Sequence, residues 1–210
     1  MYWLSRYSVL MRVRTFCVTL SPEGGLDLKR RDVTMMSLDE THTMPKLFLV
    51  YLGGRTPKSN IELHDVQFVA GEAIEDTFEQ LRQRWFGTVK GLHLDTYLEL
   101  KFVDGFRIEL RPNRSSQPEK LYFVNLGGYD STNVAELHQF GVFVACSPAD
   151  AKRKGKESLL TRSVQQHKDD LFDVDDCFAV GEVGEYFVHL VPDSQVQPFV
   201  PDWFGYRVIG

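Results

Sequence analysis

The residues best suited to chemistry in this chain are histidines, and four of the six recur at matching positions in two segments, each two positions from a carboxylate. The four pairs combine one imidazole with one carboxylate and fall in two sets along the chain. They are Glu62 with His64, His93 with Asp95, Glu136 with His138, and His167 with Asp169.

In an extended backbone, residues i and i+2 point to the same face, so each pair could present both groups to one site. Imidazole and carboxylate together can bind a divalent metal ion such as zinc, manganese or iron, and can also act as general acid and base. The alternative is that these histidines hydrogen-bond to the main chain and hold loops to strands. We favour this structural role, in which each histidine contacts its own segment and the four do not converge.

The pairs occur twice because two segments of the chain, separated by a constant number of residues, are similar in sequence. KLFLVYLGG (46–54) and KLYFVNLGG (120–128) share six of nine residues at an offset of 74 positions. The same offset aligns Glu62 and His64 with Glu136 and His138, and it places His93 opposite His167. Such a match indicates a duplicated supersecondary unit. We therefore divide the core into a first half (44–115) and a second half (116–191).

Each half predicts a β-β-α-β-β unit, and thus an α+β fold with two halves related by a pseudo-twofold axis. In the first half, an apolar stripe predicts a helix whose buried residues are Ile74, Phe78, Leu81 and Trp85. In the second half, Ser147 before Pro148 is typical of a helix N-terminus.

Two turns are predicted from glycine. The Gly53-Gly54 pair and its counterpart Gly127-Gly128 are interpreted as turns that end the first strand of each half. Around Asp104-Gly105, apolar alternation on both sides favours a three-residue loop that pairs Phe102 with Phe106 and leaves Gly105 left-handed.

Composition excludes several classes of protein. The chain is 43% hydrophobic and 25% charged, as in ordinary globular proteins, and no apolar run could span a bilayer. A net charge of −5 argues against a nucleic-acid partner. Three cysteines without a short CxxC spacing indicate reduced thiols, a cytoplasmic location and no disulfide framework.

The two ends of the chain differ from the core. Residues 1–43 lack periodicity, and Met44-Pro45 directly precedes a strand pattern, so we expect a poorly ordered extension with the true start near Met44. Residues 192–210 are rich in proline and aromatic residues, which predicts an extended strap on the body.

The core resembles a bacterial family known only as a domain of unknown function, DUF1543. The resemblance lies in KLFLVYLGGRTPKSNIELHDVQFVAGE, the helix through QRWFG, LHLD, LYFVNLGGYDSTNVAELHQFGVFVA and HKDDLFDVDDCF, which span most of residues 44–190. It implies a start near Met44 and no activity, cofactor or catalytic residue.

These observations favour a non-catalytic cytoplasmic binding or interaction protein with a groove between its halves. Its partner would be another protein or a second copy of the chain. The alternative is a small metal-dependent enzyme, a hydrolase for example, that uses the paired histidines and carboxylates.

Overall fold

The computed structural model describes residues 44–128, 132–159 and 174–210, without the side chains of 174 and 175. The expected N-terminal extension, 1–43, lies outside the described residues. The described part is mostly β-sheet with two short helices, which is an α+β arrangement. None of the described helices is long and apolar enough to span a membrane.

The first half forms strands around one short helix. They are β1 (Lys46–Arg55), β2 (Leu63–Gly71), a 3-10 turn η1 (Ile74–Thr77), α1 (Phe78–Arg84), β3 (Thr88–Glu99), β4 (Phe102–Val103) and β5 (Phe106–Arg111). The second half contains β6 (Lys120–Gly128), β7 (Leu137–Ala145), α2 (Pro148–Ser158), β8 (Val174–Ala179), β9 (Glu182–Val183) and β10 (Tyr186–Pro192). The C-terminal segment adds β11 (Trp203–Val208).

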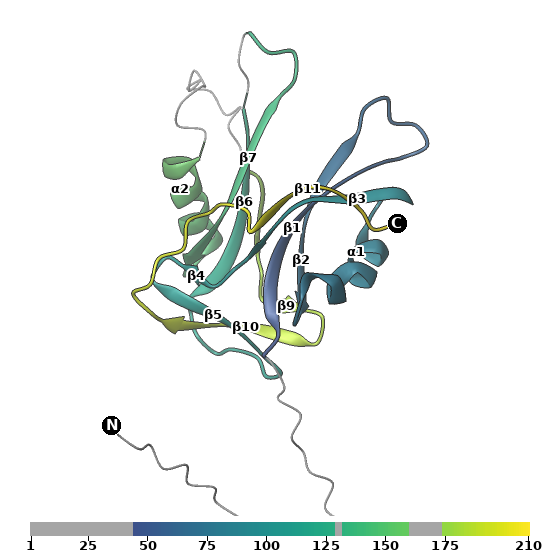
Figure 1. Ribbon diagram of the computed structural model, residues 1–210. Coiled ribbons are helices and arrows are strands. Elements are labelled where there is room, and N and C mark those ends of the chain that lie inside the picture. Colours follow the sequence, from purple (N-terminus) through teal and green to yellow (C-terminus); the bar gives the residue numbers. More distant parts are fainter. Residues whose placement is uncertain (1–43, 129–131, 160–173) are drawn as a thin grey trace, which may run out of the picture. The chain divides into compact units, whose positions relative to one another are not determined.

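Three sheets result (Figure 1). Sheet A has the order β11-β3-β1-β2, and sheet C has the order β7-β6-β8. Sheet B, with the order β4-β5-β10-β9, takes two strands from each half, and its central pair β5–β10 is antiparallel.

Alternation along β1 and β6 separates the core into three clusters. Leu47 and Leu49 face the second half, where they join Phe123 and Val142 in the central cluster. The alternate β1 residues, such as Val50, pack beneath α1, while the alternate β6 residues pack beneath α2. Sheets A and C therefore bury both faces along part of their length, which explains the continuous apolar runs in β1 and β6.

The helix predictions are largely confirmed. Ile74, Leu81 and Trp85 are buried, and Phe78 is partly buried against the same cluster. The stripe starts in a 3-10 turn, not in the α-helix itself. Ser147 caps α2, since its hydroxyl accepts a hydrogen bond from the Asp150 amide at 3.2 Å.

The predicted three-residue hairpin loop is wrong. Val103 pairs with Phe106, so the turn contains only Asp104 and Gly105, with φ angles of 49° and 83°. Both central residues are left-handed, as a two-residue hairpin turn requires, and the left-handed Gly105 is confirmed. The pattern misled because the chain leaves sheet A at Glu99 and enters sheet B at Phe102, so the apolar alternation does not belong to one strand.

Candidate functional site

Three neighbouring strands of sheet A bring together the four polar residues of the first half. His64 lies on β2, His93 and Asp95 lie on β3, and Glu62 directly precedes β2. Gly53 on β1, between these strands, pairs with His64 on one side and His93 on the other. Sheet pairing therefore unites two segments that are about 30 residues apart in the sequence.

His93 is the buried centre of this group, with 2% of its side chain exposed. Its Nδ1 lies 2.9 Å from the Gly91 carbonyl oxygen, which can only accept, so Nδ1 carries a proton. Its Nε2 lies 2.8 Å from Glu62 Oε1 and 3.4 Å from Asp95 Oδ1. A contact between Nε2 and an ionised carboxylate requires a second proton or another cation, because two lone pairs repel.

His64 reaches the same aspartate from the other side. Its Nε2 lies 3.3 Å from Asp95 Oδ2, and its ring stacks on Tyr51 with 5.1 Å between centroids. The contacts thus form a chain from His64 through Asp95 and His93 to Glu62, which we call the quartet. The expectation that each histidine would bond only to main chain does not hold for His64 and His93.

Gly53 makes room for the quartet. A β-carbon at this position would lie 2.3 Å from His93 Nε2 and 2.9 Å from Asp95 Oδ2. The prediction that Gly53 and Gly54 form a turn is wrong, because both lie within β1 and pair with β2. Glycine is needed here for close approach: Gly53 admits the quartet on one face, and Gly54 admits the Trp85 ring on the other.

Burial changes the acid–base properties of the group. It raises the pKa of Asp95, while the neighbouring His93 and His64 act in the opposite direction. Burial also raises the pKa of Tyr51, and the Asp95 charge adds to that effect. As the side chains lie, no three His, Cys, Asp or Glu residues within 44–128, 132–159 and 174–210 are grouped so as to hold a metal ion.

The second half does not repeat the quartet in the way the sequence offset suggests. His138 Nε2 lies 3.6 Å from Glu136 Oε2, while His167 and Asp169 lie outside the described residues. Strand register corrects the alignment: Leu52 pairs with Leu94, and its counterpart Leu126 pairs with Val174. The offset has therefore grown from 74 to 80 residues.

In the sequence, an offset of 80 residues aligns His93 with position 173, which lies outside the described residues, and Asp95 with position 175; both positions hold aspartate. The alignment of His93 with His167 assumed an offset of 74 residues, but six additional residues precede β8, so that offset no longer applies there. Among the described residues, a buried histidine between two carboxylates is therefore found in the first half.

A second feature is an apolar groove of about 490 Å³ between the halves, lined also by the C-terminal segment. Its walls are mainly aliphatic and aromatic side chains from β3, β4, β7 and the residues after β10. The apolar residues that line it are Leu98, Leu100, Phe102, Val103, Phe140, Val142, Phe143, Leu159, Val196, Pro198 and Phe199.

Polar contacts hold the walls of this groove in place. The Gln197 side chain accepts from the amides of Lys101 and Phe102 at 2.8 and 3.1 Å, and donates to the Glu99 carbonyl at 2.7 Å. These are the backbone groups left open where the chain crosses from sheet A to sheet B. A single side chain therefore ties the C-terminal segment to this break.

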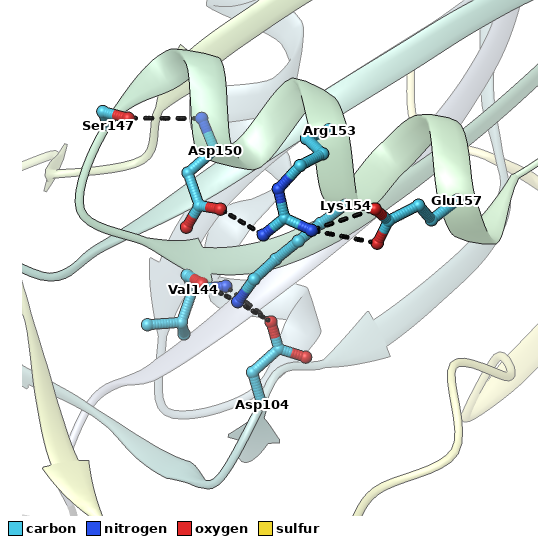
Figure 2. Close-up of polar contacts among 7 residues, drawn as sticks. All are labelled: Asp104, Val144, Ser147, Asp150, Arg153, Lys154 and Glu157. Atoms are coloured by element: carbon cyan, nitrogen blue, oxygen red, sulfur yellow. Dashed lines mark hydrogen bonds and ion pairs between the residues drawn. The ribbon is translucent and has the colours of Figure 1, made fainter.

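The opposite wall is held by Asp104 from the first half (Figure 2). Its Oδ2 accepts from the Val144 amide at 3.0 Å and lies 3.4 Å from Lys154 Nζ, which donates to the Val144 carbonyl at 2.6 Å. The turn of the β4–β5 hairpin is thus bonded to β7 and α2, so the groove is formed before any ligand arrives.

Aromatic rings connect the groove to the quartet. Phe140 in the groove contacts Phe199 at 6.4 Å and Tyr51 at 5.7 Å, and Tyr51 stacks on His64. Tyr206 on β11 covers the His93 ring at 4.0 Å. Sequence reasoning missed the roles of Tyr51, Tyr206 and Gln197, because their partners lie on strands distant in the sequence.

Other candidate groups show ordinary surroundings. Cys146 is exposed, and the pKa of the Cys177 thiol is raised by burial, which disfavours the nucleophilic thiolate. On the basic face of α2, Arg153 bonds to Asp150 and Glu157, and Lys154 to Asp104.

Comparison with known proteins places these features in a family. The model of the Domain of Unknown Function (DUF1543) matches residues 59–110 and 133–181, one match in each half. The crystal structure of protein Il1583 from Idiomarina loihiensis is similar, with 40% identity and a TM-score of 0.64, over 79% of this chain and 99% of that one. A search of curated proteins found no match.

Proposed function

The chain belongs to the DUF1543 family, and we propose that it is a non-catalytic binding protein whose ligand lies in the groove between its two halves. The observation that carries this proposal is the groove itself, with a volume of about 490 Å³ and walls already tied together by Gln197 and Asp104. Small-molecule sites are typically preformed, mainly apolar and about 300–1,000 Å³ in volume.

The lining favours a largely neutral ligand. Among the described residues that line the groove, Asp104 is the one charged side chain, and Lys154 and the Val144 amide already contact its carboxylate. The remaining polar groups are mostly amides, namely Gln139, Gln195 and Gln197, which suit a ligand with an apolar body and a few hydrogen-bonding groups.

The symmetry of the halves supports a groove built by duplication. We infer that they are copies of one β-β-α-β-β unit related by an approximate twofold axis. In support, Lys46 pairs with Gly71 as Lys120 pairs with Ala145, at the same strand offset. Both central strands also shift register at equivalent points, after Tyr51 and after Asn125.

The cysteines and the net charge bear on the location and the partners of the protein. We propose a cytoplasmic protein without a nucleic-acid partner, supported by the free thiols of Cys146 and Cys177 and the net charge of −5. A protein ligand or a second copy would use the groove through an inserted apolar side chain.

Titration with a neutral polarity-sensitive dye such as Nile red tests the groove. We expect the protein to bind the dye with increased fluorescence, and Phe199→Glu to weaken binding at least tenfold because it introduces a charge into an apolar wall. Phe204→Glu is the matched control, since both phenylalanines are exposed (46% and 79%) and only Phe199 lines the groove. The proposal fails if the wild-type protein does not bind the dye or if both variants weaken it equally.

A further inference from the structure

The quartet of Glu62, His64, His93 and Asp95 has no part in the groove proposal. We infer that it is a binding site for one divalent transition-metal ion of the zinc class. The nitrogen and oxygen donors it presents are those that zinc binds in proteins.

The strongest support is the orientation of His93. Its Nδ1–H is committed to the Gly91 carbonyl, so Nε2 is the free coordinating atom, and it is directed at Glu62 and Asp95. Metal-binding histidines usually donate their second ring N–H to a carbonyl or carboxylate in this way, which fixes the tautomer. Oxygen atoms of two carboxylates lie within 3.4 Å of this Nε2, so nitrogen and oxygen donors converge on one point beside the buried ring.

The spacing of the donors is also close to that of a metal shell. The His93 Nε2 atom lies 2.8 Å from Glu62 Oε1 and 3.4 Å from Asp95 Oδ1, and the His64 Nε2 atom lies 3.3 Å from Asp95 Oδ2. Two ligands of one tetrahedral zinc ion, each bonded at about 2.0–2.1 Å, are separated by roughly 3.3–3.4 Å.

The four side chains do not enclose an ion as they stand, since they form a chain. His93 is buried and hydrogen-bonded, and Asp95 is mostly buried beside it. Glu62 and His64 are 39% and 37% exposed, so both can rotate toward the fixed pair. The ion would then take its place beside the His93 Nε2 atom, with the Asp95 carboxylate as the second fixed donor.

The glycine at position 53 is a further indication. Glycine weakens a strand interior relative to alanine because it loses more backbone freedom on folding. Here its missing β-carbon leaves space that the His93 Nε2 and Asp95 Oδ2 atoms occupy. The strand therefore accepts a poor β-former at the point where the donors meet.

The test is calorimetric titration of the untagged full-length chain with Zn²⁺ after treatment with a chelator. We expect a stoichiometry of one ion per chain. The double variant Glu62→Gln/His64→Ala should weaken binding about 10–100-fold or more. Both of its positions are partly exposed, so the variant should stay folded, as circular dichroism will check.

The matched control is Glu136→Gln/His138→Ala, which changes the equivalent pair in the second half and should leave zinc affinity unchanged. Binding lost only in the first-half variant supports the site. Absence of zinc binding by the wild-type chain, or equal loss in both double variants, overturns it. Neither outcome affects the dye titration, so the two proposals are tested separately.

Discussion

Gly53→Ala is the most informative single substitution, because ordinary strand preferences predict the opposite result. Replacing a strand glycine by alanine usually gains about 0.4–1 kcal/mol, mainly by reducing the freedom of the unfolded chain. In this protein the added β-carbon would lie 2.3 Å from His93 Nε2 and 2.9 Å from Asp95 Oδ2. His93 is fully packed, so its ring has to move.

Two contributions set the magnitude. Forcing an extra carbon into a packed site costs about 1–3 kcal/mol. Displacing His93 also breaks its contacts with Gly91 and Glu62, and a lost hydrogen bond to a charged group costs about 1.5–3 kcal/mol. After the gain from reduced chain freedom is subtracted, we expect a net loss of about 1.5–5.5 kcal/mol. For a domain of this size that is roughly 3–22 °C in Tm.

Urea unfolding followed by tryptophan fluorescence measures this loss, with thermal melts as a second readout. Gly181→Ala is the control, since a β-carbon there meets no atom within 4 Å and its φ is not left-handed. We expect Gly181→Ala to be neutral or slightly stabilising.

A double-mutant cycle attributes the effect to His93. In a His93→Ala background the added methyl group of Gly53→Ala has space, so its cost should fall by about 0.5–3 kcal/mol. If Gly53→Ala is as stable as the wild type, or equally harmful with and without His93, the close packing of β1 against the quartet is refuted.

Three further outcomes are expected. Trp85→Ala should destabilise by about 3–5 kcal/mol in urea unfolding because it empties the core beneath α1, whereas exposed Phe86→Ala should not; similar values for both would contradict this packing. Hydrogen bonding to Arg111 lowers the pKa of Glu109, so the ionised carboxylate stabilises the fold above pH 4.5, and this stabilisation is lost as pH falls through the lowered pKa. Over that acidic range the Tm of Glu109→Gln should fall less steeply than the Tm of the wild type. Parallel curves of Tm against pH would refute this linkage. Gln197→Ala should cost about 1–3 kcal/mol and speed amide exchange in the residues after β10, and unchanged exchange would show that the side chain does not hold this segment.

The sequence by itself determined the features that depend on local periodicity and local chemistry. Helical spacing of Ile74, Leu81 and Trp85 correctly predicted that all three are buried, although only Leu81 lies within α1, between Ile74 in the 3-10 turn and Trp85 just after the helix. Ser147 before Pro148 marks a helix start because the hydroxyl reaches an amide three residues on. The duplication was readable where spacing had not changed, at the strands and at Glu62 and Glu136.

The tertiary structure decided everything that depends on which strands pair. Gly53 reads as a turn in sequence, and only the imidazole across the sheet explains a glycine inside a strand. The predicted equivalence of His93 with His167 is not supported by the strand register, because an insertion changes the offset between the halves from 74 to 80 residues. The quartet joins β2 to β3 across β1 and the groove joins both halves to the C-terminal segment. Spacing along the chain carries no information on contacts of that kind, because sheet pairing sets them.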